Sequence, residues 1–163
     1  MLDQEFDSLT AGDTFTTRGR TVTEADVAAF ASLTGDMHPQ HTDAVWAAQS
    51  PFGARIAHGM LVLSYALGLM PFDPDRVLAL RGVRQAVFKR PVRLGDTIHA
   101  EGTIDSLAAI DESAGLVRVR AEVLNQDGKL VARTSLDVLW RRGEAPKPLP
   151  AEYTDPVLVG LPL

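Results

Sequence analysis

The chain has 163 residues, 45% of them hydrophobic, and a formal net charge of -5 at pH 7. This length is typical of one domain with a sizeable core, and the acidic balance argues against a nucleic-acid partner. There is no cysteine, which excludes disulfides, thiolate metal ligands and a cysteine nucleophile. The first ten residues hold three acids and no basic residue, unlike a secretory signal. No stretch approaches the ~18 apolar residues of a membrane span, so we expect a cytoplasmic protein without a membrane segment.

The first third of the chain carries strand and helix signals. Residues 14–22 mix Thr, Phe and Val and predict a first strand. Thr23 and Asp26 form a capping-box pattern ahead of apolar residues at helical spacing, and Gly35 is a suitable end for that helix. A second, short helix is expected before the break at residues 50–53.

The run from Met60 to Met70 is apolar nearly all round, and Pro71 and Pro74 end it. A helix that is apolar on every face is usually buried on every face. We therefore predict a central, buried helix.

After residue 77 the pattern changes to short strands. The predicted strands are residues 83–88, 97–104, 116–124 and 130–140. Together with the central helix they indicate an α+β fold in which an antiparallel sheet wraps the helix, as one domain over residues 1–142. Residues 143–163 contain five prolines and are expected to be a Pro-rich tail. A homodimer that joins two sheets edge to edge would protect the edge strands.

The residues that suggest chemistry lie in the segment 35–43. Asp36 and His41 are five residues apart on a turn that Pro39 stiffens, and Gly59 lies at the start of the central helix. A carboxylate, an imidazole and a helix N-terminus can hold a water against a polarised carbonyl. The pattern indicates water addition or removal beside a thioester.

Three blocks carry a family resemblance. Residues 30–43, which contain Gly35-Asp36-Met37-His38-Pro39-Gln40-His41, resemble the G-D-x-N-P-x-H motif of the MaoC-like, (R)-specific enoyl-CoA hydratases. Residues 56–61 and 87–97 resemble the next two blocks of that family. The resemblance implies a single hotdog domain that reversibly hydrates a trans-2-enoyl thioester. The carrier would be coenzyme A or the phosphopantetheine of an acyl carrier protein, bound as part of the substrate, with no separate cofactor.

The resemblance implies catalytic roles for Asp36 and His41. The pKa of an unperturbed imidazole lies near neutrality, so His41 can take a proton from water. Gly59 is expected to donate its N–H to the thioester oxygen, because unpaired amides point outward at a helix N-terminus. Two residues depart from the family pattern: His38 replaces an asparagine and Gln40 replaces an aliphatic residue.

Further candidates for substrate binding are His38, His58, Ser64, Arg84, Lys89 and Arg90. The basic residues between positions 81 and 93 could meet the phosphates of the carrier, although a solvated strand face is an equal alternative. His58 could instead orient its loop, and Ser64 could pack in the core. The histidine spacing matches no common zinc pattern, so no metal is expected.

Three other functions stay open at this point. Some hotdog proteins hydrolyse thioesters, but members with that activity usually carry an acid on the central helix, and residues 60–70 contain none. Addition of an amine to the same enoyl thioester is kept open by His38. A non-catalytic partner subunit is disfavoured by the intact Asp36 and His41 pair.

Overall fold

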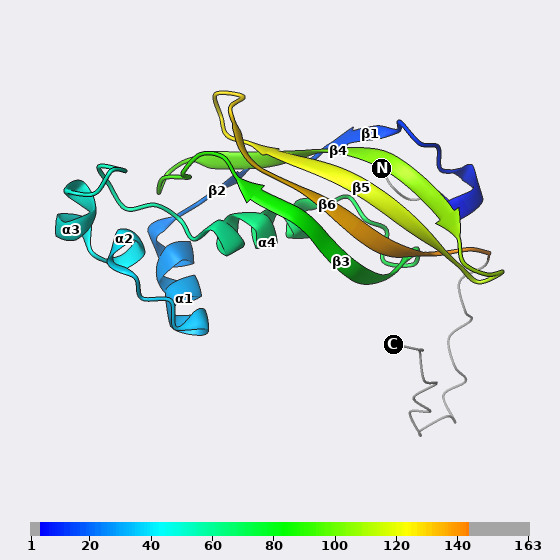
Figure 1. Ribbon diagram of the computed structural model, residues 1–163, viewed down its shortest axis with the longest axis horizontal. Helices are drawn as coiled ribbons and strands as arrows, with labels where there is room; N and C mark the ends of the chain where they lie inside the picture. Colours follow the sequence, from blue (N-terminus) through cyan, green and yellow to red (C-terminus); the bar gives the residue numbers. More distant parts are fainter. Residues whose placement is uncertain (1–3, 144–163) are drawn as a thin grey trace, which may run out of the picture.

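The computed structural model describes residues 4–143, which form the expected α+β fold (Figure 1). The helices are a 3-10 turn at Phe6–Ser8, α1 (Glu24–Thr34), α2 (Pro39–Thr42), α3 (Ala44–Ala48) and α4 (Gly59–Leu69). The strands are β1 (Thr14–Thr16), β2 (Arg20–Thr21), β3 (Val77–Phe88), β4 (Thr97–Ala109), β5 (Ala114–Leu124) and β6 (Leu130–Arg141). The predicted tail beyond residue 143 lies outside the described residues, and no helix within them is long and apolar enough to cross a membrane.

The six strands form one antiparallel sheet in the order β1-β4-β5-β6-β3, and β2 pairs with the first two residues of β4. Alternate residues of β4 and β5 face the core, as the period of two in their burial patterns shows. These inward side chains and one side of α4 form the core. Among its members are Leu61, Val62 and Ala66 of α4 and Val117, Val119, Ala121 and Val123 of β5.

The predicted strand over residues 14–22 is divided into β1 and β2. Thr17 interrupts it, although the ladder with β4 is kept: the Thr17 hydroxyl accepts the Ala100 N–H at 2.9 Å, and the Thr17 N–H donates to the Ala100 carbonyl at 2.9 Å. Because a side chain replaces one backbone partner, the strand changes direction there. The chain then leaves the sheet towards α1.

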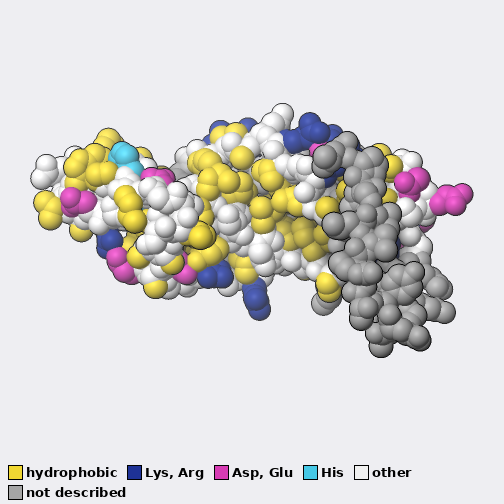
Figure 2. Space-filling model, turned by 90° about the horizontal axis from the view of Figure 1, so that it is seen from below, with side chains coloured by type: hydrophobic (Ala, Val, Ile, Leu, Met, Phe, Trp, Pro, Cys, Tyr) yellow, Lys and Arg dark blue, Asp and Glu magenta, His cyan; other side chains and the backbone are white. Residues whose placement is uncertain are grey.

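The expectation that α4 is buried on every side is wrong for the described chain. Leu61, Val62 and Ala66 are buried, whereas Met60 is 56% exposed and Ser64 is also exposed. The sheet covers only one side of the helix. Figure 2 views the face of the molecule that carries α4, and hydrophobic side chains are exposed across it.

Helix α1 begins and ends as its sequence predicts. The Thr23–Asp26 capping box is present, and Gly35 ends the helix in the left-handed conformation with φ 75°. A contact between helices then fixes its position: the Tyr65 hydroxyl of α4 helps to lower the pKa of Asp26 to about 2, and Arg20 stacks 3.7 Å above the Tyr65 ring. This contact ties α4 to the helix that precedes the candidate site.

Candidate active site

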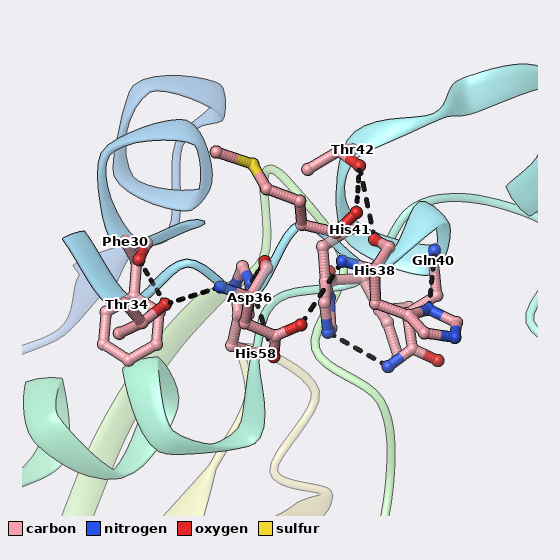
Figure 3. A network of polar contacts seen from close by, with 10 residues as sticks. Phe30, Thr34, Asp36, His38, Gln40, His41, Thr42 and His58 are labelled. Carbon is pink, nitrogen blue, oxygen red and sulfur yellow. Dashed lines mark hydrogen bonds and ion pairs between the residues drawn. The ribbon is translucent and has the colours of Figure 1, made fainter. Parts of the chain in front are cut away.

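Asp36 follows the glycine that ends α1. Its carboxylate accepts the His38 N–H at 3.3 Å, and its side chain is 53% exposed. His38, rather than Asp36, caps α2, because the His38 Nδ1 accepts the Gln40 N–H at 3.2 Å. The Asp36 carboxylate therefore stays available for a ligand (Figure 3).

His41 lies on α2 and is 4% exposed. Its Nδ1 lies 2.7 Å from the Ile56 carbonyl oxygen. A carbonyl can only accept, so Nδ1 carries the hydrogen and the neutral ring keeps its lone pair on Nε2. Burial lowers the pKa of His41 below its ordinary value of 6.5, and the neighbouring His58 acts in the same direction. His41 is thus held neutral, as a base requires.

His58 links the two catalytic candidates. It is the residue before α4, is 2% exposed, and donates from Nε2 to the Asp36 backbone carbonyl at 3.0 Å. The same Nε2 lies 4.0 Å from the Asp36 carboxylate. The His58 ring also stacks on the His41 ring, with centroids 3.7 Å apart. His58 therefore fixes the loop of Asp36 against the ring of His41.

One oxygen of Asp36 and one nitrogen each of His41 and His58 lie within 4.8 Å of one another. Two groups that each bind one water at about 2.8 Å are separated by roughly 4.6 Å, so a single water can bridge Asp36 and His41. The same three side chains are close enough to ligate one metal ion, so the expectation that no metal is bound stays a prediction.

Gly59 is the first residue of α4, and no side chain caps the helix before it. Its N–H belongs to the first turn, where amides have no partner within the helix. A methyl group at Gly59 would lie 3.0 Å from the Phe88 ring. The aromatic ring thus approaches the backbone closely, beside an amide that can donate to a ligand.

These groups open into one cavity of about 590 Å³. Its apolar walls include Phe30, Phe52, Ile56, Val62, Phe88 and Val131. Its polar lining includes Asp36, Gln40, His41, His58, Lys89 and Arg90. Lys89 and Arg90 are exposed, so they lie on the solvent side of the cavity. The space combines an apolar interior, an acid–base pair and a cationic entrance.

Six of the nine residues predicted from the sequence line this cavity, namely Asp36, His41, His58, Gly59, Lys89 and Arg90. The other three lie elsewhere. Arg84 binds the buried Asp137 on the opposite face of the sheet, where Arg118 binds the same carboxylate at 2.8 Å. Ser64 is exposed and donates to the Met60 carbonyl at 2.7 Å. His38 caps α2 and packs edge-on against Trp46.

Sequence reasoning did not assign a site role to Gln40 or Phe88. The Gln40 side-chain nitrogen lies 3.0 Å from the His41 Nε2, and Phe88 covers Gly59. Both residues belong to blocks that resemble the family motif, which was the available signal. The Phe88 contact depends on packing between segments far apart in the chain, whereas Gln40 meets its neighbour His41 within α2.

The family model of the MaoC-like domain matches residues 7–125. Protein MaoC of Klebsiella aerogenes is 41% identical over 99 residues, which are 60% of this chain and 30% of that protein. An (R)-specific enoyl-CoA hydratase of Rhodospirillum rubrum is 36% identical over 91 residues, which are 54% of this chain and 61% of that protein. The matched region thus spans less than two thirds of these relatives.

Solved structures extend the comparison. The crystal structure of a monoamine oxidase regulatory protein from Archaeoglobus has a TM-score of 0.81 and 39% identity, covering 86% of this chain and 96% of that one. A Mycobacterium tuberculosis protein described as a double hotdog fold has a TM-score of 0.77 and 25% identity, covering 89% of this chain and 46% of that one. With the family model matched over most of its length, this chain belongs to the MaoC-like domain family and has the hotdog fold.

Proposed function

We propose that this protein catalyses the reversible addition of water to a trans-2-enoyl thioester, giving the (R)-3-hydroxyacyl thioester. One observation carries the proposal: the Asp36 carboxylate and a neutral His41 lie within 4.8 Å at a cavity that also exposes the first amide of α4. The (R)-specific hydratase among the relatives supports the same reaction and its stereochemistry.

In the proposed reaction a water is held between Asp36 and His41. The His41 Nε2 takes a proton from the water as its oxygen bonds to C3. The π electrons of the C2–C3 bond move towards the thioester carbonyl and form an enolate. The Asp36–His41 pair then returns a proton to C2, so that one water has been added in total and the site is regenerated.

The enolate oxygen needs a donor that is already in place. The Gly59 N–H, at the positive end of α4, supplies it. A donor aimed at the developing charge lowers the barrier more than it stabilises the ground state. The amide therefore favours both directions of the reaction.

The remaining substrate contacts follow from the lining of the cavity. The apolar side chains accommodate the acyl chain, and Lys89 and Arg90 attract the phosphates of coenzyme A or of the phosphopantetheine of an acyl carrier protein. The carrier is part of the substrate, so the reaction requires no further cofactor.

Two alternatives are less well supported. Thioester hydrolysis on this scaffold usually uses an acid on the central helix, and α4 has neither Asp nor Glu among its 11 residues. Amine addition rested on His38, but the His38 ring caps α2 and is not among the residues that line the cavity.

A homodimer is part of the proposal. Strand β3 lies at one edge of the sheet and exposes Leu78, Leu80, Val83 and Phe88. An apolar edge strand is a template for pairing with another chain. Pairing of two β3 strands would cover these side chains and join the two sheets.

The test is a mass-spectrometric assay with a panel of enoyl and acyl thioesters, followed by chiral separation of the product. We expect a gain of one water on trans-2-enoyl thioesters, an (R)-configured alcohol, and loss of this activity in Asp36→Asn. Release of the free thiol without addition at C3 would replace the hydratase by a thioesterase. An amine adduct formed faster than the hydroxy product would favour conjugate addition.

A further inference from the structure

The lone pair that His41 needs as a base is already engaged. Because the His41 Nδ1–H donates to the Ile56 carbonyl at 2.7 Å, only Nε2 can accept a proton. The side-chain nitrogen of Gln40 lies 3.0 Å from this Nε2, as the dashed line in Figure 3 marks. An amide nitrogen only donates, so Gln40 fills the acceptor position where a reacting water must bind.

The backbone of Gln40 is held on both sides. Its N–H donates to the His38 Nδ1 at 3.2 Å, and its carbonyl accepts the Ile56 N–H at 3.1 Å. The same residue, Ile56, therefore holds both the Gln40 backbone and the His41 ring. Gln40 is half-buried at the cavity, so its side chain can swing away while α2 stays in place.

We propose that Gln40 is a positioning residue whose carboxamide occupies the His41 lone pair in the substrate-free protein and gives up this place to the attacking water. The inference rests on the proposed hydratase function and adds a competing step to it. An aliphatic side chain at the same position, which the family pattern has, could not compete in this way. When water replaces the Gln40 amide, the His41 Nε2 lone pair becomes free to take a proton. His41 therefore acts as a base only when water has entered the site.

The charged and titratable groups around His41 come from three segments. Asp36 follows α1, His38 begins α2, and His58 precedes α4, and all three influence the ring electrostatically. Lys89 and Arg90 after β3 line the same cavity. Any test of Gln40 must leave these groups unchanged, which substitutions of the Gln40 side chain alone achieve.

The first experiment tests the contact between Gln40 and His41 without measuring enzyme activity. Nitrogen NMR of the histidine rings distinguishes a free Nε2 from one that accepts a hydrogen bond, and the chain has only 4 histidines to assign. In Gln40→Leu we expect the His41 Nε2 signal to move towards that of a free acceptor, with the tautomer unchanged. The exposed Gln49→Glu is the control and should leave the signal as in wild type. An unchanged signal in Gln40→Leu would overturn the contact.

The second experiment tests the competition between the Gln40 amide and water for the His41 Nε2. At a pH where His41 is neutral, Gln40→Leu should raise kcat/KM for crotonyl-CoA hydration by about fivefold, the equivalent of one hydrogen bond of typical net strength. Gln40→Glu removes the donor and favours a protonated ring, so the acid limb of its pH profile should move to higher pH, whereas Gln49→Glu should not move it.

A fall of kcat/KM in Gln40→Leu with unchanged melting temperature would overturn the competition, because the amide would then assist the water. A wild type that hydrates no enoyl thioester would overturn the proposed function and the exchange with water together. The NMR result would still decide the contact between Gln40 and His41 separately, so the two failures are distinguishable.

Discussion

The imidazole rings of His41 and His58 stack with their centroids 3.7 Å apart and their planes inclined by 24°. Two stacked imidazoles cannot both carry charge without repulsion. Burial lowers the pKa of His41 first, and the neighbouring His58 lowers it further, against the opposing influence of the Ile56 carbonyl and Asp36. The stack therefore helps to keep a base available in a buried position.

The pKa of His41 has a consequence for stability. In the unfolded chain His41 titrates near its ordinary value of 6.5, and in the folded protein below it. Between these two pKa values the unfolded state binds more protons, so stability rises with pH and is lost as the pH falls through this window. Urea unfolding from about pH 5 to 8 should show this loss in wild type and a smaller loss in His41→Asn. The variant Gln49→Leu changes an exposed side chain without altering a titratable group and should keep the wild-type slope.

Variants of Asp36 and Asp43 are expected to have opposite effects on turnover and on stability. Asp36→Asn should lower turnover by about a hundredfold or more without a change in melting temperature, because the side chain is exposed. Asp43 caps α3 by accepting the Val45 and Trp46 N–H groups at 2.9 Å. Asp43→Ala should cost about 1 kcal/mol of stability and keep turnover within a few-fold. Similar kinetics in both variants would contradict the assignment of Asp36.

His41→Ala should lower turnover as strongly as Asp36→Asn, but it should also lower the melting temperature. The sequence places both residues on one turn that Pro39 stiffens and does not distinguish their burial. The structure buries the His41 ring to 4% exposure and uses it to bind the Ile56 carbonyl. Calorimetry of both variants tests this difference, and equal melting temperatures would argue against the buried contact.

Gly59 and Gly68 lie on the same helix and differ in their surroundings. An added methyl at Gly59 would meet the Phe88 ring at 3.0 Å, whereas Gly68 has nothing within 4 Å. Gly59→Ala should therefore lower turnover, and Phe88→Leu in the same chain should restore part of it. Gly68→Ala should stabilise the protein by about 1 kcal/mol with unchanged kinetics. If Gly59→Ala is as active as wild type, the Phe88 ring moves aside for the added methyl and does not constrain the Gly59 amide.

Variants of Lys89, Arg90 and Arg84 distinguish residues that bind substrate from a residue that stabilises the fold. Lys89→Ala and Arg90→Ala should raise KM for a coenzyme A thioester several-fold, and the effect should shrink at high salt. Arg84→Ala should leave KM unchanged and lower the melting temperature by a few degrees, since Arg84 binds the buried Asp137. An increase of KM in Arg84→Ala would show that the opposite face of the sheet takes part in binding.

The edge strand β3 provides the test of the dimer. Light scattering should give about twice the chain mass of 17.6 kDa. The double variant Leu80→Lys and Val83→Lys places two charges on the exposed edge and should give the mass of one chain. The variant Leu33→Lys changes an exposed apolar side chain of α1 and serves as the control. A wild type with the mass of one chain would overturn the dimer.

Local signals in the sequence were sufficient for much of the fold. The capping box at Thr23 and the glycine stop at Gly35 depend on nearest neighbours along the chain, and the structure has both. The alternation of β5 likewise reflects a period of two that any half-buried strand must have. Asp36 and His41 are five residues apart, so one local turn is enough to bring them close together.

Packing between distant segments decided the rest. The stack of His58 on His41 and the cover of Phe88 over Gly59 join different elements, and the Ile56 carbonyl binds the His41 Nδ1 from a segment 15 residues away. The basic residues after position 81 do not form one binding surface, for a similar reason. Successive side chains of a strand point to opposite faces of the sheet, and Arg84 binds Asp137 of β6. Local patterns specify the elements and their periods, whereas side-chain partners depend on which segments the sheet brings together.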